Sequence, residues 1–277
     1  MDLATVIEGI ERQAFKHAVE SPADYIGENG LLYCGNCHTA KQFRGSFLGV
    51  EKTVPCVCKC RKEELEAEER ARQWEQTQKT IREYRRMGFP ESDMQHWTFD
   101  NAGSCKIISA AQKYVDNFQQ FKADGKGLLL HGGVGVGKTF AAACIVNALI
   151  DKGRPCLMTN FSRILNTLWG IDEKQAYIDS LNKFDLLVLD DLGIERQSEY
   201  VQEQVFNVVD SRYRAKLPLI VTTNLPLKEL TSPASVGYGR IYDRLLEMCH
   251  PVKVEGESRR RQKVAGGYAS MNAMLGL

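Results

Sequence analysis

The segment from His131 to Phe140 reads HGGVGVGKTF, and its residue types could hold the phosphates of a nucleotide. It matches the pattern G-x-x-x-x-G-K-[ST], in which glycines let backbone N–H groups approach the phosphates. Lys138 would neutralise the β- and γ-phosphates, and the Thr139 hydroxyl would ligate Mg²⁺. A chance match is the weaker alternative. The predicted nucleotide-binding residues are Gly132, Gly133, Val134, Gly135, Val136, Gly137, Lys138, Thr139 and Phe140.

Two carboxylates and an amide follow later apolar runs. In LLVLDDLG, Asp190 would hold the metal through its water shell, and Asp191 would orient or deprotonate the attacking water. An ordinary helix N-cap is the alternative, but the preceding phosphate loop disfavours it. Asn224 ends IVTTN and could hydrogen-bond the γ-phosphate or the water, although it could also be a plain turn residue. These residues predict hydrolysis of a nucleoside triphosphate, with ATP and Mg²⁺ as the expected cofactors.

Five of the nine cysteines fall between positions 34 and 60. In a chain without an apparent secretory leader, clustered thiols usually bind metal rather than form disulfides. We expect a structural zinc site, because four thiolates suffice for tetrahedral Zn²⁺ and no acid or base candidate lies nearby. Cys56 or His38 could replace one ligand, and five free thiols are the alternative. The favoured ligands are Cys34, Cys37, Cys58 and Cys60.

The composition limits the partners that the chain could bind. Its 36 basic and 35 acidic residues give no global positive field, so contact with nucleic acid requires a local patch. No apolar run approaches the roughly 20 residues that cross a bilayer, which predicts a cytoplasmic protein that binds no membrane. The dense basic cluster is Arg259, Arg260, Arg261 and Lys263, and the aromatic residues that could stack on bases or form core are Phe161, Tyr238 and Tyr242.

The hydrophobic pattern predicts the elements that must position these residues. Apolar runs at 127–131, 154–159, 184–191, 217–224 and 250–255 predict strands, and helices are expected at 137–151, 161–169, 173–182, 199–215 and 238–248. This alternation indicates an α/β fold with a five-stranded parallel sheet covered by helices on both faces.

The N-terminal third has a different pattern. Apolar spacing predicts a short amphipathic helix at 3–19, and residues 61–86 lack Gly and Pro and place Glu66 and Glu68 four positions before Arg70 and Arg72. The latter segment predicts a long solvated helix rather than an arm that binds nucleic acid. The expected organisation is a zinc-binding domain at 1–60, a helical linker at 61–88 and an ATPase domain at 89–277.

Residues 85–265 resemble the AAA+ ATPases, and more closely the DnaC/DnaI helicase loaders and the related IstB transposition ATPases. The resemblance lies in MGFPESDMQHWTFDN, HGGVGVGKT, LLVLDDLG, IVTTN, GRIYDRL and ESRRR. It implies that Arg244 reaches the nucleotide of a neighbouring subunit, with Arg240 as second choice, and that Arg260 is the sensor 2 arginine; a solvated basic surface is the alternative for both. It also implies no C-terminal lid. Asp191 replaces the usual glutamate of the wider group, which predicts slow turnover.

The resemblance implies partners as well. In the DnaI-type layout a zinc-bearing N-terminal domain binds the replicative hexameric DNA helicase, and the ATPase domain self-associates and handles single-stranded DNA. The expected function is therefore ATP-dependent helicase loading during replication initiation. The first alternative is an IstB-like transposition helper that acts on duplex DNA, and the second is a zinc-binding adaptor with a vestigial ATPase.

Overall fold

The computed structural model describes residues 21–47, 49–89, 91–193, 198–233, 235–258, 271 and 274–275. The helix expected at 3–19 lies outside these residues. The chain forms two compact units, residues 1–78 and 79–277, and the division falls within the long helix α2 (Lys59–Met87). A separate linker at 61–88 thus stays a prediction.

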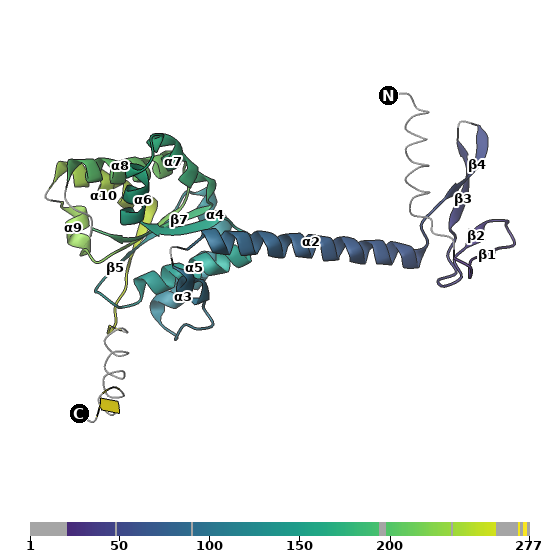
Figure 1. Cartoon of the computed structure of the whole chain (residues 1–277), viewed down its shortest axis with the longest axis horizontal. Helices are drawn as coiled ribbons and strands as arrows, with labels where there is room; N and C mark the ends of the chain where they lie inside the picture. The colour runs from purple at the N-terminus through teal and green to yellow at the C-terminus, as the bar shows by residue number, and fades with distance from the viewer. Residues whose placement is uncertain are drawn as a thin grey trace. The chain divides into compact units, whose positions relative to one another are not determined.

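The described residues of the first unit form two small antiparallel ribbons and the part of α2 up to Gln78 (Figure 1). Strand β1 (Tyr25–Ile26) pairs with β2 (Leu32–Tyr33), and β3 (Gln42–Phe47) pairs with β4 (Val50–Pro55). Among the described residues of this unit, only Cys34, Lys41 and Cys58 are buried. The ribbons therefore have almost no apolar core of their own.

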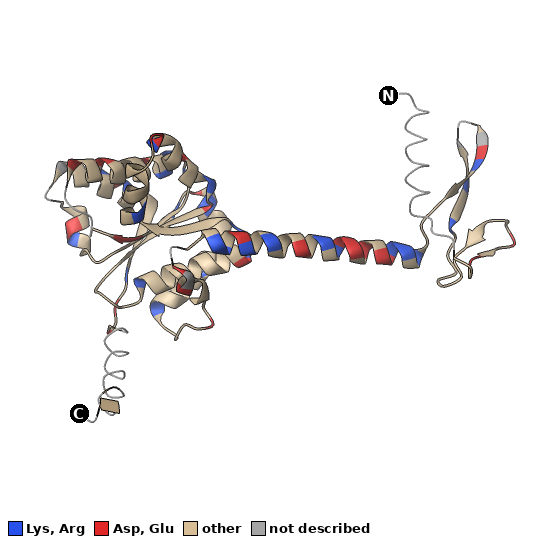
Figure 2. Ribbon diagram, viewed as in Figure 1, with Lys and Arg blue, Asp and Glu red and all other residues tan. Residues whose placement is uncertain are grey.

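Helix α2 confirms the predicted charged helix and extends it by one or two residues at each end. None of its residues is buried, and the colours of the ribbon in Figure 2 show that basic and acidic residues are interspersed along it. Arg70 lies 3.9 Å from Glu66 and Arg72 lies 3.7 Å from Glu68, as the spacing predicts. The helix ends before Gly88, whose N–H donates to the Tyr84 carbonyl. Among the described residues, no helix is both long and apolar enough to pass through a bilayer.

The second unit contains the predicted five-stranded parallel sheet, in the order β6-β7-β8-β5-β9. The strand bounds differ from the predicted ones by a few residues at most. The phosphate loop follows β5, which lies between β8 and β9, and the two acidic residues lie at the end of β7. Strand bounds are Gly127–His131 (β5), Cys156–Asn160 (β6), Leu186–Leu192 (β7), Leu219–Thr223 (β8) and Cys249–Lys253 (β9).

Helices cover both faces of this sheet, as predicted (Figure 1). One apolar cluster joins α3 (Lys106–Asp116) and α5 (Lys138–Asp151) to Leu130, Val188 and Ile220. The other joins α6 (Phe161–Trp169), α8 (Glu199–Arg214) and α10 (Val236–Met248) to alternate residues of the same strands. Burial on both faces explains why the strands read as continuous apolar runs. The shorter helices are η1 (Ser92–His96), α4 (Phe118–Ala123), α7 (Lys174–Ser180), η2 (Leu181–Lys183) and α9 (Leu227–Thr231).

Local signals set where several helices begin and end. The Asn160 side chain caps α6 by accepting from the Arg163 N–H, and Ser198 caps α8 in the same way. Helices α3 and α4 are consecutive and are divided at Asn117. The Asn117 side chain donates to the Lys113 carbonyl, so it satisfies a terminal acceptor of α3.

A buried arginine joins helix α8 to the sheet. Arg212 is 1% exposed, and its guanidinium donates to the carbonyls of Leu181, Phe184, Asp185 and Pro218. Burial lowers its pKa to about 10, so the guanidinium stays charged at neutral pH. It therefore ties the segments that enter β7 and β8 to helix α8.

Candidate nucleotide site and cysteine cluster

The phosphate loop leads from the end of β5 into the first turn of α5, so a helix N-terminus faces the loop. Gly135 has φ +81° and Gly137 has φ +104°, conformations that favour glycine. A Cβ at Gly132 would lie 2.2 Å from the Val254 carbonyl oxygen, and one at Gly135 would lie 2.2 Å from Ser258 Oγ. The loop therefore needs glycine both for its backbone angles and for its close packing against the segment after β9.

Three of the predicted catalytic residues meet at the ends of β5, β7 and β8. The Lys138 ammonium is 5% exposed and donates to Asn224 Oδ1 at 2.7 Å and to the Gly132 and Gly133 carbonyls. The Asn224 amide donates to Asp191 Oδ1 at 3.4 Å. Asn224 thus connects the lysine predicted to bind phosphate to the carboxylate predicted to orient water.

Asp190 lies beside the Thr139 hydroxyl, and the two supply oxygen donors of the kind that Mg²⁺ prefers. Thr222 Oγ1 donates to Asp190 Oδ1 at 2.6 Å. Burial raises the pKa of Asp190, and the charge of Asp191 adds to this, whereas hydrogen bonds from Thr222 and Thr139 and the charge of Lys138 oppose it. The residues present fit a magnesium ion held beside the phosphates.

The apolar residues of the loop differ in their surroundings. Val134 is exposed, whereas Val136 and Phe140 pack against the cluster of α3 and α5. The Phe140 ring centroid lies 5.7 Å from that of Trp97. The Phe140 side chain thus anchors the first turn of α5 to the core, and its contact with nucleotide stays a prediction.

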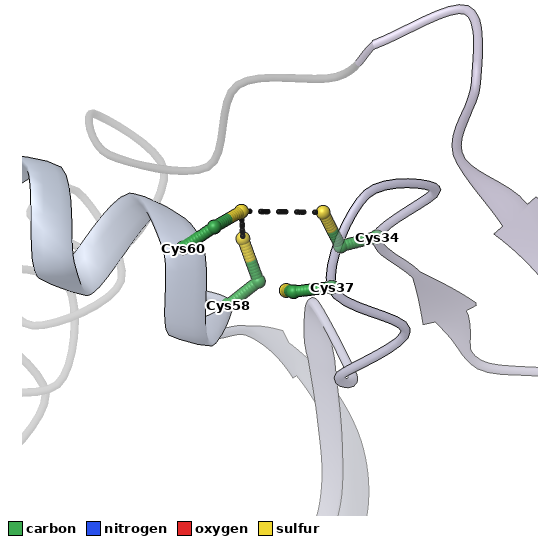
Figure 3. Close-up of side chains that lie close together, drawn as sticks. All are labelled: Cys34, Cys37, Cys58 and Cys60. Carbon is green, nitrogen blue, oxygen red and sulfur yellow. Dashed lines mark hydrogen bonds between the residues drawn. The ribbon is translucent and has the colours of Figure 1, made fainter.

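The cysteine cluster lies where the turn between β2 and β3 meets the beginning of α2. The sulfur atoms of Cys34, Cys37, Cys58 and Cys60 all lie within 4.8 Å of one another (Figure 3). Tetrahedral zinc with Zn–S bonds of ~2.3 Å requires sulfur atoms ~3.8 Å apart, so the cluster fits zinc. Cys56 instead donates to the Ala40 carbonyl.

The groups around Cys37 favour its thiolate. Hydrogen bonds from the Thr39 hydroxyl and from backbone N–H groups lower the pKa of Cys37 to about 5. The buried pair of Lys41 and Asp24 lies beside the cluster, with Lys41 Nζ 2.5 Å from Asp24 Oδ2. Asp24 also accepts from the Gly35 N–H, and the Lys41 hydrogen bond holds its pKa at about 2. The pair therefore joins the Cys34–Cys37 turn to the following strand.

The site geometry agrees with a family match. The family model described as IstB-like ATP binding protein matches residues 60–266. The chain belongs to the IstB-like ATP-binding proteins. The match begins at Cys60, so most of the cysteine cluster lies outside it.

The relatives of this IstB-like protein include two helicase loaders and a protein from an insertion sequence. The replicative helicase loader DnaI of Bacillus subtilis is 30% identical over 149 residues, 49% of this chain and 48% of the relative. The replicative helicase loader DnaC of Escherichia coli K12 is 29% identical over 148 residues, 50% of this chain and 59% of the relative. A protein of Mycobacterium tuberculosis named for ATP binding in an insertion sequence is 26% identical over 177 residues, 62% of this chain and 70% of the relative. The chain therefore spans about half the length of the two loaders.

Solved structures show the same fold. A crystal structure of DnaI is 26% identical and superposes with a TM-score of 0.52 over 62% of this chain and 95% of that chain. A crystal structure of the DnaC helicase loader, 22% identical, gives a TM-score of 0.52 over 60% of this chain and 100% of that chain. The second comparison shows the fold alone.

The IstB-like chain engages Arg244 within its own fold. Arg244 lies on α10, is 26% exposed and places Nη2 2.8 Å from Asp210 Oδ1 of α8. Its guanidinium also covers the Phe206 ring at 4.4 Å from the centroid. Arg240, one turn earlier, is exposed. The structure thus places Arg244 in an intrachain ion pair, and a role across subunits stays a prediction for either arginine.

The structure distinguishes between the two alternatives for the aromatic residues, which were stacking on bases and forming the core. Phe161 and Tyr242 belong to the buried cluster of α6, α8 and α10, so as core residues they are not available to stack on bases. Tyr238 stacks on Tyr242 at 5.7 Å. The basic cluster lies outside the described residues, and its members are Arg259, Arg260, Arg261 and Lys263. The sensor 2 role of Arg260 therefore stays a prediction.

Sequence reasoning missed an aromatic platform on the second unit. Trp169, the last residue of α6, is 62% exposed, and its ring stacks on that of Tyr200 with centroids 6.3 Å apart and an interplanar angle of 15°. Lys174 Nζ lies 5.1 Å from the Tyr200 centroid. In the sequence, only the tryptophan at the edge of the apolar face of α6 could have indicated this platform. Its partner Tyr200 is distant along the chain, so no local pattern connects the two residues.

Proposed function

We propose that this protein is an ATP-dependent helicase loader that binds the replicative hexameric DNA helicase and delivers it onto single-stranded DNA. The observation that carries the proposal is the network of Lys138, Asn224, Asp191 and Asp190 at one edge of the sheet, in a chain whose relatives include proteins named replicative helicase loaders. ATP binding and hydrolysis would act as the switch between two states of the assembly.

The site divides the work of hydrolysis among its residues. Lys138 would exchange its carbonyl partners for the β- and γ-phosphates, and Thr139 with Asp190 would hold Mg²⁺. Magnesium, when bound, supplies positive charge that stabilises the transferring phosphate. Asp191 would orient the attacking water, and Asn224 would keep that carboxylate beside the phosphates.

Hydrolysis is tested with Lys138→Ala, which removes the charge that holds the phosphates. We expect the variant to lose ATP hydrolysis and helicase loading together. A vestigial ATPase on a zinc-binding adaptor predicts instead that loading by the variant equals that of the wild type.

Self-association would place Arg244 beside the nucleotide of a neighbouring copy, where phosphate would replace Asp210 as its partner. Mixing two inactive variants tests this arrangement. Lys138→Ala subunits keep the arginine, Arg244→Ala subunits keep the nucleotide site, and a mixture should regain hydrolysis. If Arg240 acts across subunits, a mixture of Arg240→Ala and Lys138→Ala subunits should regain hydrolysis instead. Absence of complementation for both arginines contradicts the proposed contact between subunits.

Single-stranded DNA would stack on the platform of Trp169 and Tyr200, with Lys174 near the phosphates. Stacking of a base on an aromatic ring contributes about 1–3 kcal/mol, so Trp169→Ala should weaken binding of a poly-dT oligonucleotide at least about fivefold. Trp74→Ala is the matched control, because Trp74 is 67% exposed on α2 and has no aromatic partner assigned in the structure. Equal effects of the two substitutions on oligonucleotide binding contradict the platform.

We propose that the cysteine cluster holds zinc and that the first unit, which contains it, binds the helicase. Capture of the purified replicative helicase of the same host by the full chain tests this. Cys34→Ser should abolish capture while ATP binding persists, and Cys56→Ser, outside the cluster, should leave capture unchanged. Capture retained by Cys34→Ser would move helicase binding to the ATPase unit.

The second candidate is an IstB-like transposition helper that acts on duplex DNA. It is favoured by the family description and by the insertion-sequence relative, whose match covers more of both chains than the loader matches do. The helper predicts ATP-dependent oligomers on duplex DNA and no capture of the helicase, whereas the loader predicts capture and preference for a single strand.

A further inference from the structure

The two acidic residues of β7 lie at an irregularity in the sheet. Leu189 pairs with Val221 and Leu192 pairs with Thr223, so Asp190 and Asp191 together face the single residue Thr222. This is a β-bulge, in which regular backbone pairing is interrupted. Asp191 has φ +58°, a left-handed conformation that is uncommon outside glycine. On the β8 side the backbone ladder does not hold these two residues, although Asp190 keeps its pairing with Asn160 of β6.

One buried hydroxyl replaces the missing pairing. Thr222 Oγ1 accepts from the Asp191 N–H at 2.9 Å and donates to Asp190 Oδ1 at 2.6 Å. Thr222 is fully buried, so water cannot take over either contact. The hydroxyl uses its donor on one acidic side chain and its acceptor capacity on the backbone of the next.

The adjacent residue provides a contrast. Thr223 is also fully buried, but its hydroxyl donates to the Leu192 carbonyl and accepts from the Leu225 N–H. Both of these hydrogen bonds join the Thr223 hydroxyl to backbone groups, and neither involves a carboxylate. The two threonines are equal in burial and hydrogen-bonding capacity and differ in whether they contact a carboxylate of the nucleotide site.

We propose that Thr222 is a positioning residue, whose hydroxyl aims the Asp190 carboxylate at Mg²⁺ and fixes the backbone from which Asp191 reaches the attacking water. The inference deepens the proposed ATPase function and depends on it for the identity of the metal and nucleotide. A valine would fill the same volume without either hydrogen bond. The alternative is a threonine that only satisfies the bulge and stabilises the fold.

The test compares full-length Thr222→Val, Thr222→Ser and Thr223→Val with the wild type. Nucleotide affinity is measured in EDTA and across a magnesium titration, together with hydrolysis rate and melting temperature. For Thr222→Val we expect the same nucleotide affinity in EDTA as for the wild type. The Mg²⁺ concentration that gives half of the gain in nucleotide affinity should be about tenfold higher, and turnover should be about tenfold slower. Thr222→Ser keeps the hydroxyl and should match the wild type, and Thr223→Val should keep the wild-type magnesium requirement whatever its melting temperature.

The outcomes separate the inference from the function on which it depends. A Thr222→Val protein that melts earlier but keeps the wild-type magnesium requirement and turnover shows a purely structural role and overturns the proposal. If the wild type and Lys138→Ala both fail to hydrolyse ATP, the proposed function fails, and the gain in nucleotide affinity on adding Mg²⁺ still tests Thr222. Should Thr222→Val not fold, Thr222→Cys, a weaker donor of similar size to serine, replaces it in the same titration.

Discussion

The two units of this chain are stabilised in different ways. The described residues of the first unit include three buried ones, two of them cysteines of the cluster. The second unit has a parallel sheet between two extensive apolar clusters. Short ribbons that bury little apolar surface cannot offset their conformational entropy without a further constraint, whereas the larger unit can. The difference indicates that the first unit depends on its cysteine cluster for folding, while the predicted catalytic residues of the second lie on a scaffold with an apolar core of its own.

The largest effect should follow from removing one ligand of the proposed zinc site. Cys34→Ser should unfold the first unit, because structural zinc contributes about 10–16 kcal/mol in comparable small modules. Hydrogen exchange should rise throughout residues 21–58 and stay unchanged in β5–β9, with loss of bound zinc by elemental analysis. Cys56→Ser is the control and should keep both zinc and protection. If residues 21–58 exchange equally in Cys34→Ser and Cys56→Ser, the first unit does not depend on the cluster for its folding, and the proposed difference between the units is wrong.

A smaller effect is expected from a cavity in the second unit. Leu168→Ala removes a fully buried side chain of α6 and should lower the free energy of unfolding of this unit by about 2–5 kcal/mol. Urea denaturation monitored by far-ultraviolet circular dichroism measures the loss, and zinc content should not change. Asn166→Ala, exposed on the same helix, is the matched control. A loss of zinc from Leu168→Ala would show that the two units do not fold independently.

The smallest effect concerns the ion pair beside the cysteines. Lys41→Met leaves the Asp24 carboxylate without its cation next to four thiolates, so zinc affinity should fall by about tenfold. Competition with a chelating dye at neutral pH measures this fall. The hydrogen bond from Lys41 holds the pKa of Asp24 at about 2, so the pair is charged throughout the range in which thiolates hold metal. Lys52→Met, exposed on β4, is the control, and equal losses in both variants would exclude a specific role for the pair.

Several features were predictable because they depend on local pattern. The five strands, the helix α6 and the charged helix α2 follow from apolar spacing and from the positions of glycine and proline. The meeting of Lys138, Asp190 and Asn224 follows from placing their segments at the carboxyl ends of parallel strands. The four cysteines that meet are those that the sequence favoured, because Cys58 and Cys60 lead directly into a helix, although Cys56 and His38 stayed open as alternatives.

Other features could not be read from one segment. Whether Phe161 is exposed depends on α8 and α10, which bury it. The partner of Arg244 is Asp210 on another helix, and the platform at Trp169 requires Tyr200 from the start of α8. Each of these contacts joins residues that are distant along the chain, and their pairing depends on how helices pack.

Residue type and short spacing are enough to specify the available chemistry, which is a phosphate loop, two carboxylates at a strand end and a set of thiols. Which of these groups meet depends on how the strands and helices pack. The bulge that aims Asp190 and Asp191 exists because β7 and β8 pair with two residues opposite one, and Thr222 contacts both acids because that register places its hydroxyl between them. Register between strands far apart in the chain is set by packing across the whole sheet, which no local pattern encodes.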